Sequence, residues 1–288
     1  MTLAMTVPDL RDGYVEIGRE IMRHGRQSSP RGYSTTELED VVIEVDDVSR
    51  LMPVGVGRDP KTEIGLAEAL LLCGGLSSPS LMQSVSPAFG KFLDGGDLHG
   101  AYGRRVRPQM DSVIRRLKED SDSRQAIVTI WDPLHDTQDG LHDTPCTLGF
   151  GFRIRDDELR MTSLMRSQDF WLGMAYDLFF FSQLGHSVAN TLGIEFTSLR
   201  HHVMSLHAYA RDYDKIENLH EFGGEAFFEE PTGFGVFSGG LSYEPTRLRA
   251  EKIYDQVPLD QPPTRSEVAY ARMLSRFSRD VRTAGFTN

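Results

Sequence analysis

Cys146 is the residue whose type and neighbours best suit covalent chemistry in this chain. It follows a proline in HDTPCTLGF, at the head of an apolar segment that is typical of a β-strand. A second strand, after the short DDE turn, would end at Arg166 and Ser167, close to where the first begins. A guanidinium near a thiol lowers the thiol pKa, as a cysteine nucleophile requires. We therefore expect a nucleophile here; a small buried hydrophobe is the alternative.

Three arginines in separate segments are candidates for binding an anion. Arg31 lies in SSPRG, Arg124 in DSRQ and Arg166 in MRSQD, each among small polar residues. One such arginine is typical of a solvated surface, but three in an acidic protein predict a clamp for a phosphate or carboxylate. His207 and Tyr209 in SLHAY would share one strand face and could bind a sugar hydroxyl; an ordinary half-exposed strand is the alternative.

A cysteine hydrolase would need a base held by an acid. His142 is the nearby histidine, and the sequence identifies no acid to orient it. We therefore expect the thiol to serve a different reaction.

Composition excludes several classes of protein. The 288 residues carry a formal net charge of -11 and have a pI near 5.3, which argues against coating nucleic acid or an anionic membrane. Two cysteines cannot form a disulfide framework, so we expect a reducing, cytoplasmic setting. The first ten residues do not match a secretory signal, and no apolar run reaches the roughly 20 residues of a membrane helix. We expect no metal.

The elements that must position these residues alternate between helix and strand. The periodicity predicts helices at 10–25, 62–75, 108–120, 176–192 and from 210. It predicts strands in LEDVVIEVDD, in QAIVTIWDP as a buried strand, in a hairpin around DDE and in LRHHVMSLHAY, with a loop over FLDGGDLHGAYGRR. The fold class is α/β (α+β) with substantial antiparallel pairing.

The C-terminal part differs from the rest in composition. Gly and Pro clusters precede a last predicted helix, which begins at a capping box from Thr264 to Glu267. We expect a catalytic core at 1–222 and an extension at 223–288 packed on it, within one domain overall.

TPC, RSQDFWLG and SLHAY, at these spacings, resemble the thymidylate synthase family. The resemblance extends from about Tyr14 to Leu219, with SPRG like the phosphate loop, LAEALLLCGG like the glutamate helix and DLHGAYG like the tyrosine loop. It implies a mixed six-stranded sheet with helices on one face, and a homodimer packed through the sheets.

The same resemblance implies roles for individual residues. Cys146 would attack C6 of a pyrimidine nucleotide, and C5 would take the one-carbon unit of 5,10-methylenetetrahydrofolate. The implied site residues are Glu68 and Tyr102 for water and proton transfers, Arg31, Arg166 and Ser167 for the phosphate with Arg124 from the partner subunit, His207 and Tyr209 for the 3′-hydroxyl, and Asp169 for the pterin.

Three positions, one stretch and the tail depart from the family pattern, in addition to Asp177. Gln125 stands where a second arginine is usual, Thr147 replaces a histidine and Ser205 replaces an aspartate. The stretch before the tyrosine loop, VSPAFGKFLDGG, has no tryptophan, and the tail is unlike the segment that closes over the folate.

Asp177 is the most informative departure, because the family's thymidylate synthases have asparagine there. Cytosine has no proton on N3, so a protonated carboxyl can donate to N3 while its other oxygen accepts from N4. Burial beside the apolar LFFF run would raise the carboxyl pKa and help to keep that proton. Aspartate is also the residue of the family's cytidylate hydroxymethylases. A simple helix cap is the alternative.

These features favour a dCMP 5-hydroxymethyltransferase. The missing tryptophan favours water over folate hydride as the final nucleophile. CMP hydroxymethylation, as for nucleoside antibiotics, is the next alternative; the unmodified Ser167 region favours the deoxy form. A dCMP methyltransferase and an ordinary thymidylate synthase follow. A degenerate member that binds a nucleotide without turnover is the non-enzyme alternative.

Overall fold

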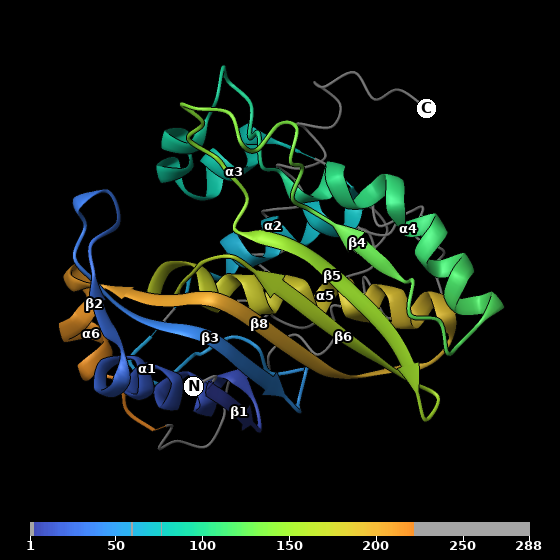
Figure 1. Ribbon diagram of the computed structural model, residues 1–288, viewed down its shortest axis with the longest axis horizontal. Helices are drawn as coiled ribbons and strands as arrows, with labels where there is room; N and C mark the ends of the chain where they lie inside the picture. The colour runs from blue at the N-terminus through green and yellow to red at the C-terminus, as the bar shows by residue number, and fades with distance from the viewer. Residues whose placement is uncertain (1–2, 59, 76, 222–288) are drawn as a thin grey trace, which may run out of the picture.

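One mixed β-sheet organises the chain (Figure 1), in a computed structural model that describes residues 3–58, 60–75 and 77–221. The strands are β1 (Leu3–Val7), β2 (Arg26–Ser28), β3 (Thr35–Val45), β4 (Ile127–Thr129), β5 (Thr147–Arg155), β6 (Glu158–Met165), β7 (Gln168–Asp169) and β8 (Glu195–Tyr209). Six follow the order β1-β3-β8-β6-β5-β4, while β2 joins β3 and β7 joins β8. The expected mixed sheet is confirmed, with eight strands instead of six.

Six α-helices accompany the sheet in the described part of the chain. They are α1 (Leu10–His24), α2 (Thr62–Gly74), α3 (Pro79–Val85), α4 (Tyr102–Glu119), α5 (Ala175–Leu192) and α6 (Tyr213–Glu217). Gly75 and Gly193 end α2 and α5 in the left-handed conformation, which glycine adopts without strain. No helix among the described residues is long and apolar enough to cross a membrane.

Two predicted boundaries were wrong. The stretch expected to be a loop through 105 is helical from Tyr102, and α4 runs on through Pro108. Burial of Val106 and Met110 outweighs the backbone hydrogen bond that a proline cannot donate. The expected buried strand at 125–133 is the short edge strand β4, in which Val128 alone is buried.

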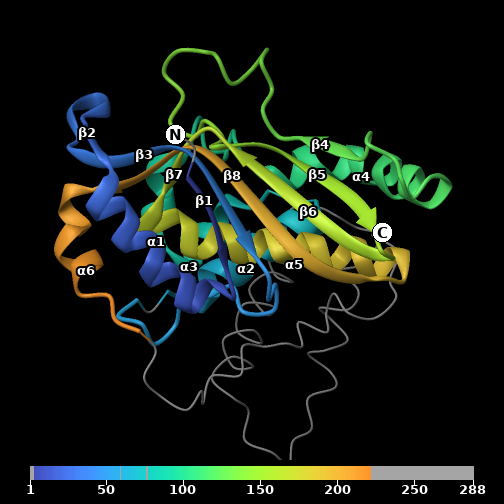
Figure 2. The same ribbon diagram turned by 60° about the horizontal axis from the view of Figure 1, so that its bottom comes forward.

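The two faces of the sheet differ sharply in exposure. Along β8, Leu199, His201 and Val203 are buried, and Figure 2 shows α1, α2 and α5 on one side of the strands. The alternate residues face away from these helices; Leu164 on β6 and Met204 on β8 are 43% and 56% exposed. Side-chain alternation in a strand produces this division. The tail and its predicted last helix lie outside the described residues.

Candidate active site

A cavity of about 240 Å³ lies where α2, α4 and α5 meet. Its polar side chains include Glu68 from α2, Tyr102 from the start of α4, Asp177 from α5, and Asp143 from the loop before β5. The wall is otherwise mostly apolar, with Leu71, Leu72, Met82, Phe89, Phe92, Leu98 and Phe180 among its residues. Such a cavity, apolar with a few converging polar groups, is typical of a small-molecule site.

Asp177 lies in the first turn of α5 but does not cap it. The helix begins at Ala175 after Met174, whose side chain makes no cap hydrogen bond. The Asp177 carboxyl instead accepts a 2.6 Å hydrogen bond from Gln168 Nε2 at its Oδ2 atom. Burial raises the pKa of Asp177 to about 7, against a weaker lowering by Gln168. The alternative of a helix cap is therefore wrong.

Two buried acceptor atoms beside Asp177 have no hydrogen-bond partner among the described residues. They are Glu68 Oε2 and Gln168 Oε1. Burial, and then the nearby Asp177, raise the pKa of Glu68 well above its ordinary value. Buried polar atoms without partners are costly, and in a cavity they are typical of atoms that bind a ligand.

Arg166 holds the segment that carries Cys146, and Asp177 and Asp143 of the cavity act electrostatically on its thiol. The Arg166 backbone N–H donates to the Cys146 carbonyl over 2.9 Å, and Arg166 Nε donates to the Pro145 carbonyl over 2.9 Å. Thr147, next in the chain, donates through its Oγ1 to the Tyr102 hydroxyl over 3.1 Å. The hairpin thus brings Arg166 to Cys146 as the sequence predicts.

The expected lowering of the thiol pKa was wrong in its net direction. Burial raises the pKa of Cys146 more than Arg166 lowers it. The carboxyls of Asp177, Asp143 and Asp169 also raise it. The sequence shows the guanidinium but not how far the thiol is buried.

Asp169, His207 and Tyr209 come together where β7 pairs with β8. Asp169 is opposite His207 in this pairing, and the His207 and Tyr209 rings meet edge to face at 5.2 Å. Asp169 Oδ1 accepts from the backbone N–H groups of Trp171 and Leu172, both at 2.9 Å. It therefore caps the short π-helical turn η3 (Phe170–Met174) that connects β7 to α5.

The structure brings only some of the predicted anion-binding residues into the same part of the fold. Arg31 lies on the turn before β3, with φ 54°, and that strand pairs its Thr35 with Tyr209. Ser167 lies between Arg166 and β7. Arg124, in contrast, lines a separate depression at the C-terminal end of α4, whose residues do not overlap with those of the cavity.

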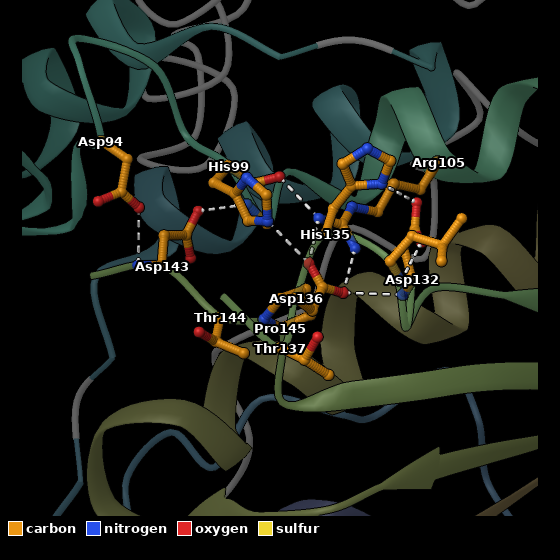
Figure 3. A network of polar contacts seen from close by, with 12 residues as sticks. Asp94, His99, Arg105, Asp132, His135, Asp136, Thr137, Asp143, Thr144 and Pro145 are labelled. Carbon is orange, nitrogen blue, oxygen red and sulfur yellow. Dashed lines mark hydrogen bonds and ion pairs between the residues drawn. The ribbon is translucent and has the colours of Figure 1, made fainter. Parts of the chain in front are cut away.

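The loop before Cys146 contains acids that sequence reasoning missed (Figure 3). His142 does have an acidic partner: its Nδ1 lies 2.7 Å from Asp94 Oδ1, so the expectation of no orienting acid was wrong. His142 is largely exposed, and Asp143 rather than His142 lines the cavity. Asp143 Oδ2 accepts from the Gly100 N–H over 2.8 Å. The available signal in the sequence was an acid three residues before Cys146.

Gln168 and Gly173 were also missed. A Cβ at Gly173 would lie 2.7 Å from Gln168 Nε2 and 3.0 Å from Asp177 Oδ2. The glycine in RSQDFWLG therefore leaves room for the Gln168–Asp177 pair, which only the folded backbone brings into contact.

Comparison with known proteins agrees with this geometry. The model of the family described as thymidylate synthase matches residues 12–222. The deoxyuridylate hydroxymethyltransferase of Bacillus phage SP01 is 29% identical over 218 residues, which cover 69% of this chain and 57% of that protein. The enzyme of the same name from Pseudomonas phage M6 is 31% identical over 56% of this chain and 48% of its own length.

The match to a third relative extends over nearly the whole length of that protein. This Methanothermobacter thermautotrophicus protein, provisionally named thymidylate synthase, is 28% identical, over 76% of this chain and 99% of its own length. The chain thus spans about half the length of the phage relatives but nearly all of this one. Because the family match extends through the sheet, the cavity and the loop that carries Cys146, the chain belongs to the thymidylate synthase family.

Proposed function

We propose that this protein transfers a one-carbon unit from 5,10-methylenetetrahydrofolate to C5 of a pyrimidine nucleoside monophosphate and releases the product as a hydroxymethyl nucleotide. The preferred substrate is dCMP, with CMP as the alternative sugar. The single observation that carries the choice of cytosine is the Asp177 carboxyl, which lines the cavity with a pKa of about 7.

The hydrogen bond from Gln168 supports a defined direction for that carboxyl. Gln168 Nε2 donates to Oδ2, so Oδ2 acts as an acceptor and the proton belongs on Oδ1. Oδ1–H would donate to N3 of cytosine, and Oδ2 would accept from N4 with its second lone pair. Uracil carries a proton on N3 and an oxygen on C4, so in this orientation Oδ1–H would meet N3–H and Oδ2 would meet O4, and both contacts would be unfavourable.

The remaining roles that we propose are those implied by the resemblance to the family. Cys146 would attack C6 as the thiolate; Glu68 and Tyr102 would handle proton transfers at the base. Arg31, Arg166 and Ser167 would hold the phosphate, and His207 and Tyr209 the sugar hydroxyl. The apolar wall with Phe89 and Phe92 suits a flat folate ring, and the Asp169 carboxyl would bind the pterin.

A homodimer would complete the phosphate site. Arg124 lies in a depression with Arg115 and Arg116, away from its own chain's cavity. Donation of Arg124 across an interface accounts for that position. The exposed sheet face with Leu164 and Met204 is the surface through which we propose that two subunits pack.

Deoxyuridylate hydroxymethylation is the second candidate. The names of the two phage relatives support it, because both are deoxyuridylate hydroxymethyltransferases. Asp177 opposes it through its fit to cytosine. The two candidates share the hydroxymethyl product and differ only in the base.

Product analysis by mass spectrometry tests this proposal. The full chain is incubated with methylenetetrahydrofolate and, separately, with dCMP, CMP and dUMP. Addition of CH2O to a cytidylate, with tetrahydrofolate released, supports hydroxymethylation and identifies the sugar. Addition of CH2 with dihydrofolate formed would replace it with methylation, and turnover of dUMP as fast as dCMP would remove the role of Asp177.

The non-enzyme alternative has its own test. Fluorinated dCMP with the folate should form a covalent adduct on the wild type and none on Cys146→Ser. Failure of the wild type to form any adduct with fluorinated dCMP or dUMP would support a protein that binds without turnover.

A further inference from the structure

Asp143 is a cavity carboxylate that none of the roles above uses. It lies three residues before Cys146 and lines the same cavity as Tyr102 and Asp177. It also acts electrostatically on the Cys146 thiol and raises the pKa of that thiol. Figure 3 shows it between Asp94 and the chain that follows His99.

The three carboxyls of the cavity have different surroundings. Burial, and then the nearby Asp177 carboxyl, raise the pKa of Glu68. Asp177 keeps its proton to about pH 7. Burial raises the pKa of Asp143 above its ordinary value and Asp94 adds to the rise, while the Gly100 N–H at Oδ2, His99 and Arg105 oppose it. Asp143 is therefore the member of this trio whose anion has a backbone donor and cationic neighbours, and its raised pKa increases its basicity.

Two clamps hold the loop that carries Asp143. Asp94 accepts from the backbone N–H groups of His142 (3.0 Å) and Asp143 (3.1 Å). Asp136, with a fully buried side chain, is bridged by both Arg105 terminal nitrogens, at 2.6 and 2.8 Å. A general base works best on such a fixed support, because its distance to the reacting atoms is then set in advance.

We propose that Asp143 is the general base that activates the water which adds to the one-carbon unit. This rests on the proposed hydroxymethylation. After tetrahydrofolate leaves, C5 carries an exocyclic methylene while C6 is bonded to the Cys146 sulfur. Water oxygen bonds to the methylene carbon, and Asp143 takes the water proton. The methylene π pair moves through C5 toward C4, then returns to form C5=C6 as the C6–S bond breaks and the thiolate leaves.

A thiol trap measures this step separately from the earlier ones. An exocyclic methylene is an electrophile, so added 2-mercaptoethanol competes with water and yields a thioether. The ratio of thioether to hydroxymethyl product reports water activation alone. Covalent capture of fluorinated dCMP and folate at Cys146 reports thiol attack and one-carbon transfer, the steps before loss of the C5 proton. The assay uses the full chain with whichever nucleotide it turns over.

Two variants distinguish the loss of the base from the loosening of the loop that carries it. Asp143→Asn keeps an oxygen to accept the Gly100 N–H but removes the base. Asp94→Ala loosens the same loop and leaves the cavity carboxylate in place. We expect Asp143→Asn to raise the thioether to hydroxymethyl ratio by about 100-fold, with adduct formation retained, and Asp94→Ala, which keeps the Asp143 carboxylate on a looser loop, to raise the ratio by no more than about tenfold.

Three results would decide against the proposal. An unchanged ratio in Asp143→Asn, or an equal change in Asp94→Ala, would overturn it while leaving hydroxymethylation intact. If Asp143→Asn does not fold, the wild type in D2O provides the test: the thioether share should rise, and a constant share overturns the proposal. A wild type that makes no hydroxymethyl nucleotide would instead show that the proposed function failed.

Discussion

Gln168 Nε2 donates a 2.6 Å hydrogen bond to Asp177 Oδ2, and this contact connects β7 to the first turn of α5 at the wall of the cavity. The contact distinguishes the two carboxyl oxygens. Oδ2 accepts the hydrogen bond from Gln168, and in the proposed function Oδ1 carries the proton. The Asp177 carboxyl is thereby oriented before any nucleotide binds.

Asp177→Asn should reverse the choice of base. An amide can donate to O4 and accept from N3–H of uracil, and it cannot supply a proton to N3 of cytosine. We expect the ratio of kcat/KM for dCMP over dUMP to fall by about 100-fold, since the loss of a positioned proton donor typically costs that much or more in rate. Steady-state kinetics with both nucleotides measures it. An unchanged ratio would mean that another residue reads the base.

Asp177→Asn should also change how stability depends on pH. The folded-state pKa of Asp177, about 7, lies above the ordinary 3.8, so folding favours the neutral form. That preference is fully present below pH 4 and is lost as pH rises through 7. Relative to Asp177→Asn, the wild type should lose up to roughly 4 kcal/mol between pH 4 and 8. Urea denaturation of both proteins at each pH measures this, and parallel curves would contradict it.

Gly173→Ala should separate Gln168 from Asp177. The added Cβ would lie 2.7 Å from Gln168 Nε2, closer than van der Waals contact permits. We expect activity on cytidylate to fall at least about tenfold. Adduct formation by the thiol should persist, because Cys146 lies on another segment. Kinetics and fluorinated-nucleotide labelling of the same preparation distinguish this outcome from general unfolding.

Alkylation of Cys146 should be slow at neutral pH and should accelerate as pH rises past 9. Burial raises its pKa and Arg166 opposes that rise, so the thiol is mostly protonated at pH 7. Arg166→Gln should slow the reaction further by removing the nearby positive charge. Iodoacetamide labelling with peptide mass spectrometry measures the rate, with Cys146→Ser as the control. Fast labelling at pH 6 would be inconsistent with this environment.

Asp136→Asn should loosen the loop that leads to Cys146. The change leaves Arg105 without its buried counter-charge, which costs about 3 kcal/mol or more in comparable sites. The pKa of Asp136, about 2, lies below its ordinary 3.8. Its stabilising effect is thus complete above pH 4 and is lost as pH falls through 2. Urea denaturation at pH 7 and limited proteolysis within 132–145 measure the change, with the exposed Asp139→Asn as a matched control.

Local sequence patterns were sufficient to predict many of the secondary-structure elements and the family. The hairpin that brings Arg166 to Cys146 followed from period-two alternation around a turn, and α5 followed from a continuous apolar run closed by Gly193. The motifs around Cys146 and Asp169 identified the family that the comparisons support. Each of these signals is carried by residues near one another in sequence.

Only the tertiary structure decided the rest. The start of α4 at Tyr102 and the edge position of β4 depend on packing between distant elements. The sign of the Cys146 pKa shift depends on how deeply the thiol is buried, and the partners of Asp177 and Asp143 lie on other segments. Side-chain burial and long-range hydrogen bonds are properties of the folded chain. The sequence therefore determined which residue types form this site, and the fold decided the protonation state and orientation of their side chains.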